Sequence, residues 1–421
     1  MAFWLSGFLP SWLGGFFLSA YTFPIMSIRP VDIVLVAIGG YGVNYVNHLL
    51  DHGDAHQARL VGAVDPFATN CPRLDDLKAH GVPIFDDLDA FYATRNADLA
   101  VISSPIHFHA PQAIAALEHG SHVLCEKPAA ATMDEVQRMI HAADDAKRML
   151  AIGYQWSYSP AILELKSHIL AGRFGRPRVF RNLVGWPRLD RYYARANWAG
   201  RIQLPDGRCV FDSPANNATA HFLHNLLFLL GGEMHTAADI ATVTAERYRA
   251  KPIENYDTAM FRIATHDGVM VYFYTSHSTH EQFGPQFELQ FDDAIVRFTH
   301  GDESMTATFT NGTTHRYGLP DYKSDTKLWR CVDAVRTGEQ VPCDIRTASA
   351  QTLCIDAAQR SRPIVDFPVA LLRDDSRPPE GVLRYVEGLA DVMHRCFEAD
   401  ALPSELGDVG WSRPAEPLRV G

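Results

Sequence analysis

The chain has 421 residues, of which 47% are apolar and 21% are charged, and its formal net charge is −11. This composition is typical of a folded protein with two or three domains, and its acidic balance argues against a nucleic-acid partner, which requires a basic face. The seven cysteines are odd in number and form no Cys-x-x-Cys pair, which predicts free thiols in the cytoplasm and no structural zinc site.

Residues 1–27 form an N-terminal extension in which no charged residue occurs before residue 26. A secretory signal needs a basic start, which is missing here, and Pro10, Gly14 and Gly15 would interrupt a membrane-spanning helix. We expect a start codon assigned too early and no membrane partner. An uncleaved anchor or an export signal is the alternative.

Short apolar runs alternate with helical patterns over residues 28–150. The runs are typical of strands buried on both faces of a parallel sheet, and they occupy residues 33–38, 60–64, 99–102 and 122–125. Helical patterns follow at 43–50, 111–119 and 132–148. This alternation predicts an α/β fold that begins with a doubly wound parallel sheet of the Rossmann type.

The pattern changes after residue 150. From about residue 177 the strands become alternating, and Asp267-Gly268 and Asn311-Gly312 are hairpin signals. Further helices are expected at 160–171, 347–361 and 381–399. We predict a second α/β domain over 151–370, with an open, mostly antiparallel sheet covered by helices on one face, and a C-terminal helix and tail over 371–421.

The first apolar run leads into a glycine-rich turn, Gly39-Gly40-Tyr41-Gly42, with an alanine where a dinucleotide-binding turn has its first glycine. Asp65 ends the second run, where a carboxylate would bind the adenosine ribose hydroxyls and repel a 2′-phosphate. These residues predict cofactor contacts, with NAD favoured over NADP. A turn without a ligand and a solvated aspartate are the plainer interpretations.

Two more segments follow strands at the same expected sheet edge. The backbone of Ser103, Pro105 and His107 would line the nicotinamide side of the crevice. The spacing of His107 and His109 suggests a metal, but no third ligand stands near them in the sequence, so we predict none. Glu126 and Lys127 follow the strand 122–125 and are also predicted to contact the cofactor. A partly desolvated lysine there would have a lowered pKa and could assist proton transfer, whereas a solvated surface lysine is the alternative.

The segment from residue 212 to residue 231 is predicted to be a helix with three polar residues on one face. Asn217, His221 and His224 stand at i, i+4 and i+7 among apolar residues. This stripe indicates a cavity lining, and a histidine there could be the acid or base for a substrate hydroxyl. A buried polar stripe with satisfied histidines is the alternative.

Taken in order, these motifs resemble those of the Gfo/Idh/MocA oxidoreductase family. The resemblance covers nearly all of residues 28–361, and it includes the Glu126-Lys127-Pro128 motif and the helix from His221 to Gly231. It implies an NAD- or NADP-dependent oxidation of a secondary alcohol on a sugar or cyclitol. It also implies a homodimer or homotetramer that forms through the open sheet.

Position by position, Lys127 matches the family's catalytic lysine and His221 its catalytic histidine. Asn217 stands where the family often has an aspartate, and His224 replaces another. The catalytic set expected from the resemblance is therefore Lys127, His221 and Asn217. Candidate substrate contacts, by position and residue type, are Tyr154, Trp156, Arg195, Asn197, Trp198 and His224.

Two other functions stay open at this point. The family resemblance also admits a glycosidase that uses NAD in a transient oxidation. The two replacements, Asn217 and His224, are consistent with a cofactor-sensing regulator without turnover.

Overall fold

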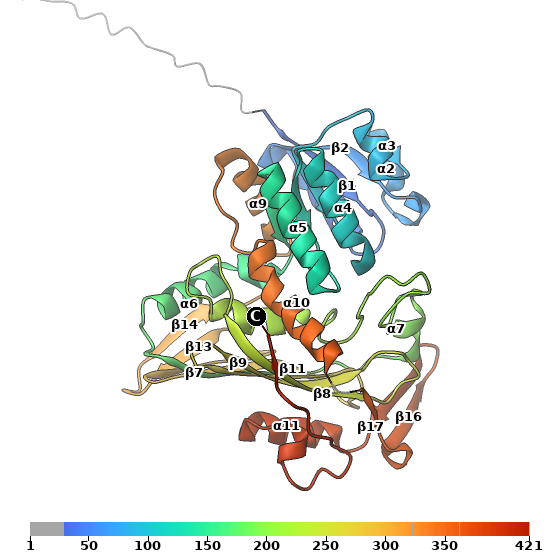
Figure 1. The fold of residues 1–421 in the computed structure, drawn as a ribbon. Helices are drawn as coiled ribbons and strands as arrows, with labels where there is room; N and C mark the ends of the chain where they lie inside the picture. The colour runs from blue at the N-terminus through green and yellow to red at the C-terminus, as the bar shows by residue number, and fades with distance from the viewer. Residues whose placement is uncertain (1–28, 322, 362, 421) are drawn as a thin grey trace, which may run out of the picture.

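The computed structural model describes residues 29–321, 323–361 and 363–420, so the predicted N-terminal extension lies outside the described residues. Two sheets, each covered by helices, are stacked one above the other (Figure 1). None of the helices in the described ranges is both long and apolar enough to cross a membrane.

The first sheet has six parallel strands in the order β3-β2-β1-β4-β5-β6. Its strands are β1 Val31–Val36, β2 Ala58–Val64, β3 Ile84–Phe85, β4 Leu99–Ile102, β5 His122–Cys125 and β6 Leu150–Ile152. Its helices are α1 Gly42–His52, α2 Leu74–Ala79, α3 Leu88–Tyr92, α4 Ile106–Glu118 and α5 Met133–Ala146. The strand order reverses between β1 and β4, and ligands of such sheets bind at this point.

Local sequence accounts for most of these boundaries. Residues Leu99–Ile102 are buried throughout, as expected for a central parallel strand. Thr132 and Glu135 form the predicted capping box at the start of α5. The predicted start of α4 is wrong, because the helix begins at Ile106 and contains Pro111. Upstream apolar residues such as Ala110, which pack into the core, extend the helix beyond the proline.

The second sheet has ten strands, with the path β14-β13-β12-β11-β7-β10-β9-β8-β15, and β18 also pairs with β8. Most neighbours are antiparallel, whereas β7–β10 and β8–β15 are parallel. The strands are β7 Pro177–Gly185, β8 Ile240–Arg249, β9 Thr258–Thr265, β10 Met270–Ser276, β11 Phe283–Phe291, β12 Ala294–Thr299, β13 Met305–Phe309, β14 Thr314–Gly318, β15 Val365–Asp366 and β18 Leu418–Arg419. The predicted fold class, a Rossmann sheet followed by a mostly antiparallel open sheet, is confirmed.

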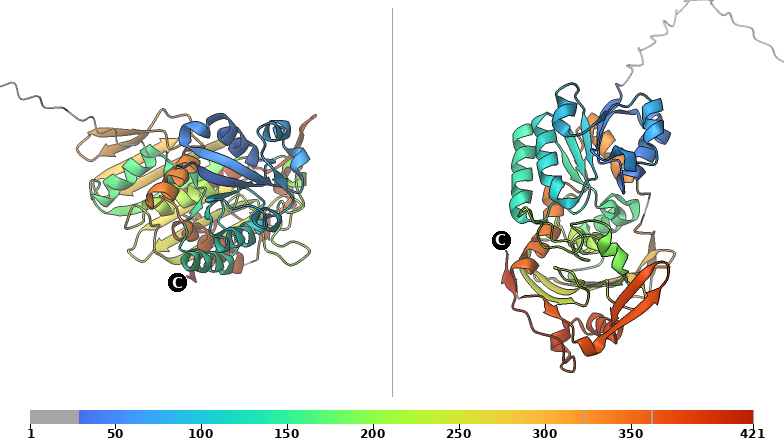
Figure 2. Two further views of the ribbon diagram at one scale, coloured as in Figure 1. Left: turned by 90° about the horizontal axis from the view of Figure 1, so that it is seen from above. Right: turned by 90° about the vertical axis from the view of Figure 1, so that its right-hand side faces the viewer.

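Helices lie on both faces of the second sheet. On β7, Phe180 packs into the core shared with α8, whereas Leu183 points to the opposite face and packs in the core shared with α11. Figures 1 and 2 show α11 on the side of the sheet that faces away from the first domain. The helices that follow β6 are α6 Pro160–Leu170, α7 Asp190–Ala194, α8 Ala220–Leu229, α9 Thr326–Thr337, α10 Ile345–Arg360 and α11 Leu389–Ala399. The prediction of a single covered face is therefore wrong.

The predicted helix 381–399 is also wrong in its first part. Residues Gly381–Val386 form strand β17, which pairs with β16, Leu372–Arg377, in a separate hairpin. Within β17, Leu383 and Val386 are buried, and Gly388 has a positive φ of 75° just before α11. The short apolar run of β17 thus belongs to a strand, and the glycine separates it from the helix.

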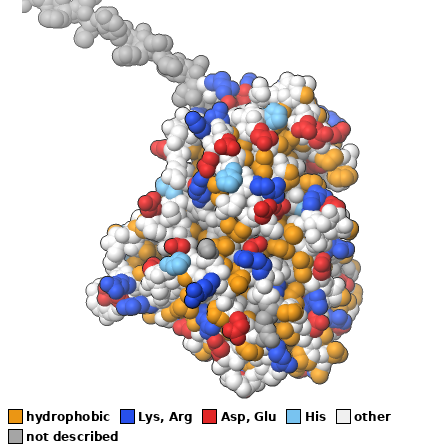
Figure 3. Space-filling view, in the orientation of Figure 1, with side chains coloured by type: hydrophobic (Ala, Val, Ile, Leu, Met, Phe, Trp, Pro, Cys, Tyr) orange, Lys and Arg blue, Asp and Glu red, His pale blue; other side chains and the backbone are white. Residues whose placement is uncertain are grey.

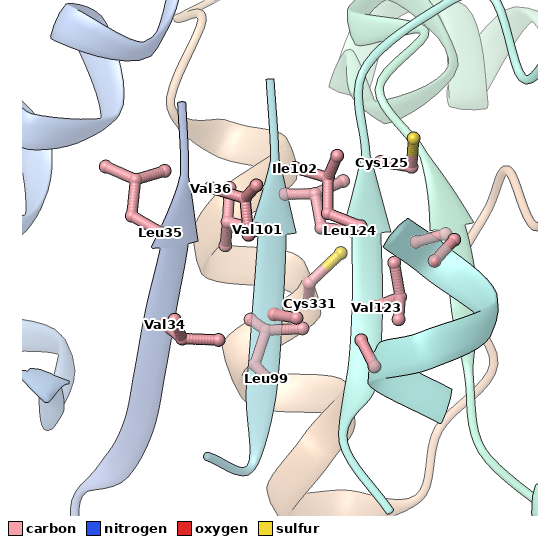
Figure 4. Packing of buried hydrophobic residues seen from close by; sticks show 14 of the residues in the cluster. Val34, Leu35, Val36, Leu99, Val101, Ile102, Val123, Leu124, Cys125 and Cys331 are labelled. Atoms are coloured by element: carbon pink, nitrogen blue, oxygen red, sulfur yellow. The ribbon is translucent and has the colours of Figure 1, made fainter. Parts of the chain in front are cut away.

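Helix α9 returns from the second half of the chain to the first sheet. Cys331 lies against Val101 and Leu124 in the first core, as Figure 4 shows. Residues of α9 such as Leu328 and Val332 are fully buried in the same core. Helix α9 thus lies within the predicted second domain, 151–370, in the sequence, but it packs in the core of the first sheet.

Candidate active site

A cavity of about 870 Å³ opens between the first sheet and the loops of the second domain. Most of its residues come from the segments after β1, β2, β4 and β5 and from the segment around α7, and Asn217 comes from the turn before α8. The lining residues are Ala37, Gly39, Gly40, Tyr41, Asp65, Phe67, Asn70, Ser103, Ser104, Pro105, Ile106, His109, Glu126, Lys127, Tyr192, Arg195, Ala196, Trp198 and Asn217. The cavity therefore joins the predicted cofactor turn to the predicted catalytic lysine. Figure 3 shows one outer face of the molecule, on which charged side chains of both signs are interspersed.

The glycine-rich turn has the backbone that a dinucleotide requires. A Cβ atom at Gly42 would lie 2.0 Å from the Ala37 carbonyl oxygen, so only glycine fits there. Gly40 has a φ of 52°, and Ala37 adopts a φ of 65°, a left-handed conformation that is unusual for alanine. The first turn of α1 follows directly, so its free amide groups face the cavity mouth, where a pyrophosphate would bind.

Asp65 holds this turn in place. Its Oδ2 accepts hydrogen bonds from the amides of Ile38 at 2.9 Å and Gly39 at 3.3 Å, and its Oδ1 accepts one from Phe67 at 2.8 Å. The carboxylate also lines the cavity. The structure thus brings Asp65 together with Gly39, Gly40 and Tyr41, and these residues fit the adenosine and pyrophosphate half of a nicotinamide dinucleotide.

The segment after β4 divides between two cavities. Ser103 lines the main cavity and the buried His107 lines a neighbouring one of about 490 Å³, while Pro105 lines both. Burial, reinforced by the nearby Arg208 charge, lowers the pKa of His107 to about 4. His109 is buried, and its two ring nitrogens lie 2.8 Å from the carbonyl oxygens of Pro128 and Ser104. This histidine thus satisfies loop backbone.

Glu126 and Lys127 point in different directions from the end of β5. Glu126 is buried, accepts a hydrogen bond from Tyr45 at 2.6 Å, and forms an ion pair with Lys327 of α9. Although burial favours the neutral acid, the Lys327 ammonium holds the pKa of Glu126 below its ordinary value. Glu126 is therefore held by Lys327, whereas the Lys127 side chain lines the cavity without an ion-pair partner among the described residues.

Lys127 is held by Asn217. Its Nζ donates to the Asn217 carbonyl oxygen at 2.8 Å and lies 3.3 Å from the side-chain oxygen of the same residue. Burial lowers the pKa of Lys127 to about 8, while the charge of Glu126 opposes this shift. An ammonium group with such a pKa is still mostly charged near neutrality and can exchange a proton with a reacting hydroxyl.

Asn217 is in turn held by a carboxylate. Its Nδ2 donates to Asp212 Oδ1 at 2.8 Å, and Asp212 Oδ2 accepts from the Gly200 amide at 2.6 Å. The Asp212 side chain is 2% exposed, and burial raises its pKa. Asn217 lies in the turn before α8, so the prediction that it shares a helical face with His221 is wrong.

His221 lies in the first turn of α8, next to this network. It is half-buried, and its ring makes an edge contact with Tyr154 at a centroid distance of 5.7 Å. Its buried Nδ1 has no hydrogen-bond partner among the described residues. Burial and the charges of Lys127 and Lys327 lower its pKa well below the ordinary value, so the imidazole is neutral and can accept a proton.

His224, Tyr154 and Trp156 lie in the core and not in the cavity lining. His224 is fully buried, stacks on Tyr154 at 3.9 Å, and has its Nε2 3.0 Å from Ser157 Oγ. Trp156 packs against Phe222. The predicted substrate contacts of these three residues therefore have no support in this arrangement. His221 is not among the lining residues either, but it is half-buried and lies beside Lys127, whereas His224 reaches into the core.

The other predicted substrate contacts belong to the segment after α7. Arg195 and Trp198 line the main cavity, whereas Asn197 lines the neighbouring one. The Arg195 guanidinium lies 3.7 Å from the centroid of the Tyr192 ring and 4.8 Å from that of Trp198. The structure thus places an arginine at the same end of the cavity as Lys127.

A group of three potential metal ligands lies outside this cavity. Glu164, His168 and His315 have ligand atoms within 4.8 Å of one another. However, Arg173 Nη1 lies 2.9 Å from His168 Nδ1, and His315 Nε2 lies 3.1 Å from Glu164. A guanidinium at this distance opposes a bound cation, so the group is better described as a polar cluster at the edge of the second sheet.

Sequence reasoning missed two residues of the site. Lys327 comes from a distant helix, and its residue type and spacing gave no signal that it would be buried beside Glu126. Asp212 opens the segment that contains Asn217 and His221, so an acidic residue five positions before Asn217 was a usable signal. Lys327 contacts Glu126 and Asp212 contacts Asn217, and the charges of both residues also act on Lys127.

Comparisons with known proteins agree with this geometry. Residues 31–154 match the description "Oxidoreductase family, NAD-binding Rossmann fold", and residues 162–297 match the "GFO/IDH/MocA C-terminal domain". Inositol 2-dehydrogenase 4 of Saccharopolyspora erythraea is 26% identical over 349 residues, which cover 79% of this chain and 92% of that protein. Inositol 2-dehydrogenase of Rubrobacter xylanophilus is 28% identical over 165 residues, which cover 38% of this chain and less than half, 44%, of that protein.

Solved structures share the fold. The WlbA dehydrogenase from Bordetella pertussis, crystallised with NADH and UDP-GlcNAcA, has a TM-score of 0.63 at 23% identity and covers 79% of this chain and 95% of its own. Levoglucosan dehydrogenase, crystallised with NADH and L-sorbose, has a TM-score of 0.62 at 17% identity, with coverages of 79% and 96%. With both of its domains matched in order, the chain belongs to the Gfo/Idh/MocA family of oxidoreductases and carries that family's NAD-binding domain.

Proposed function

We propose that this chain is an NAD(P)-dependent dehydrogenase that oxidises a secondary hydroxyl of a sugar, cyclitol or related polyol. The observation that carries the proposal is the shared cavity, in which the glycine-rich turn and the Lys127 ammonium line one continuous space. Several of the relatives are named as inositol dehydrogenases and one as a xylose dehydrogenase, which supports this substrate class. Asp65 favours NAD over NADP because its carboxylate would repel a 2′-phosphate.

The roles of the residues follow from their surroundings. The bound nicotinamide would supply the hydride acceptor. The Lys127 ammonium would donate a hydrogen bond to the substrate oxygen and stabilise the negative charge that develops on it. His221, neutral because of burial and its cationic neighbours, would take the hydroxyl proton. Asn217 would keep Lys127 in place through its two oxygens.

The test is absorbance at the NADH band across a panel of sugars, cyclitols and sugar acids, with NAD and NADP in parallel. The proposal expects net formation of the reduced cofactor with at least one compound, and a preference for NAD. Cleavage of a glycosidic bond without net NADH would favour the glycosidase alternative. Cofactor binding without turnover of any compound would favour the regulator.

The assembly and location are also proposals. We infer a homodimer or homotetramer that forms through the second sheet, with strands β12 to β14 as the contact. Helix α11 covers β7 and β10, whereas residues of β12 such as Arg297 and Thr299 are exposed. Light scattering of the purified protein tests this assembly, and a monomer would contradict it.

A cytoplasmic location is supported by the seven cysteines, all of which are free.

A further inference from the structure

The substrate end of the cavity carries an excess of positive charge. Among the described residues that line the cavity, the acidic ones are Asp65 and Glu126. Asp65 is engaged by the amides of the cofactor turn, and Glu126 is engaged by Lys327. The substrate end of the lining presents two cations, Lys127 and Arg195, while the single charge of Glu126 is shared between Lys127 and Lys327.

Asp212 balances only part of this charge. It lies behind the lining, where its Oδ2 is 3.9 Å from Arg195 Nη2 and its Oδ1 accepts from Asn217. Its remaining hydrogen bond comes from the Gly200 amide. The two buried carboxylates, Glu126 and Asp212, thus face the three cations Lys127, Lys327 and Arg195. Partly buried charges in proteins are normally paired. The residual charge at this end of the cavity is positive.

Arg195 is prepared to bind a ligand. The guanidinium contacts both the Tyr192 and Trp198 rings, at centroid distances of 3.7 Å and 4.8 Å, and it donates to the Tyr192 carbonyl oxygen. These contacts fix the plane of the group, while 30% of the side chain remains exposed. A guanidinium whose plane is fixed and whose edge is reachable offers a two-pronged donor that matches a carboxylate.

We propose that the substrate carries a carboxylate, as in a uronic or aldonic acid, and that Arg195 binds this group while Lys127 contacts the reacting hydroxyl. This inference rests on the proposed function and deepens it by naming the substrate class. Asp212 then acts as the positioning residue that holds Arg195 and Asn217 on either side of the bound substrate. A neutral polyol would leave the guanidinium with Asp212, at 3.9 Å, as its charged partner, and that carboxylate is shared with Asn217.

The experiment compares matched pairs that differ only in the acid group, D-glucose with D-glucuronate and D-galactose with D-galacturonate. Turnover is measured with NAD and NADP on the full chain and on Arg195→Gln. For at least one pair we expect the acid to have the higher kcat/KM, and Arg195→Gln to lower that value about 100-fold. The KM for the cofactor should change less than about twofold, because the arginine contacts the substrate.

Two further variants separate charge from shape and packing. Arg195→Lys keeps the charge but loses the planar fork, so it should retain an intermediate activity on the acid. Arg188→Gln is the matched control, because Arg188 also stacks on the Tyr192 ring, at 5.3 Å, but does not line the cavity. It should leave the preference for the acid unchanged.

A binding measurement decides the inference even without turnover. The NADH-loaded protein is titrated with each acid and each neutral sugar, and the shift in its melting temperature is recorded. The inference holds if an acid stabilises the wild type and not Arg195→Gln. It is overturned if the neutral sugar binds or reacts as well as the acid in both pairs, or if Arg195→Gln raises the KM for the cofactor instead. Absence of turnover in both pairs and across the wider panel, with binding intact, would count against the proposed function alone.

Discussion

The two sides of Glu126 show the same residue type in two different settings. On one side Lys127 lines the cavity, is held by the Asn217 oxygens, and has a pKa that burial lowers to about 8. On the other side Lys327 is 1% exposed and pairs directly with the carboxylate. Burial lowers the pKa of Lys327 as well, but the charge and hydrogen bond of Glu126, together with the contact to Tyr41, outweigh it and raise that pKa above its ordinary value.

The difference teaches what decides the role of a buried lysine. A lysine paired with a carboxylate keeps its proton and supports the structure, whereas a lysine held by neutral oxygens has a proton that it can exchange. Lys166 provides a further contrast within the second core. It is fully buried, donates to the Thr236 carbonyl oxygen at 2.6 Å and lies 3.6 Å from the centroid of the Phe228 ring.

The largest effect is expected on activity when the cavity side is changed. Lys127→Ala should lower kcat/KM by about 10³-fold or more, because the developing charge on the substrate oxygen loses its donor. His221→Ala should act in the same range through loss of the proton acceptor. Both variants are measured by NADH absorbance on the best substrate of the panel.

The control for these two variants is folding and cofactor binding. Circular dichroism and NADH fluorescence should match those of the wild type, because neither side chain pairs with a buried charge. Full activity in either variant would remove that residue from the proposed mechanism.

A change at Lys327 is expected to act mainly on stability. Lys327→Met should lower the free energy of unfolding by about 3 kcal/mol, because it leaves the Glu126 carboxylate buried without its cation. Urea denaturation measures this loss. Adding Glu126→Gln to the same chain should restore part of it, since the unpaired charge is then gone. A double variant no more stable than the single one would contradict the ion-pair account.

Replacement of Lys166 is expected to raise the free energy of unfolding, whereas replacement of Lys327 lowers it. Burial lowers its pKa to about 7, so the unfolded chain binds more protons between about pH 7 and 10 and the wild type gains stability as the pH rises through this range. Lys166→Met should therefore increase the free energy of unfolding by about 2 kcal/mol at pH 7. The gain should shrink toward pH 10, and a gain independent of pH would contradict the assignment.

The smallest effect is expected at the cofactor turn. Ala37 holds a φ of 65°, which glycine adopts at lower cost, so Ala37→Gly should stabilise the fold by about 1 kcal/mol or less. Thermal unfolding measures the change. Gly42→Ala is the contrasting variant, because its Cβ atom would meet the Ala37 carbonyl oxygen, and it should weaken both folding and NADH binding.

Local sequence patterns predicted the first sheet well. Continuous apolar runs identify central parallel strands, and residues that follow such strands meet at one edge of the sheet. The amino-acid sequence alone therefore indicates that Gly39, Asp65 and Lys127 lie close together. The capping box at Thr132 and the hairpin glycine Gly268 were also predictable, because their chemistry is local.

Features that depend on distant segments could not be predicted in this way. Lys327 reaches Glu126 across 201 positions, and no spacing rule connects them. Helix α11 covers the second sheet through Met393 and Phe397, although its own pattern shows only that one face is apolar. The role of Asn217 was assigned from a helical periodicity, but the helix begins only three residues later, at Ala220.

The central claim is that a tuned ammonium at Lys127 faces the substrate, and the pH dependence of kcat/KM tests it most directly. The ammonium form is required to stabilise the oxyanion, so kcat/KM should fall as the pH rises above about 8, the pKa of Lys127. In Asp212→Asn this fall should move to lower pH, because the Asp212 charge raises that pKa. A rate that rises through pH 8 would make Lys127 the base, and a profile without a transition near this pH would contradict its role.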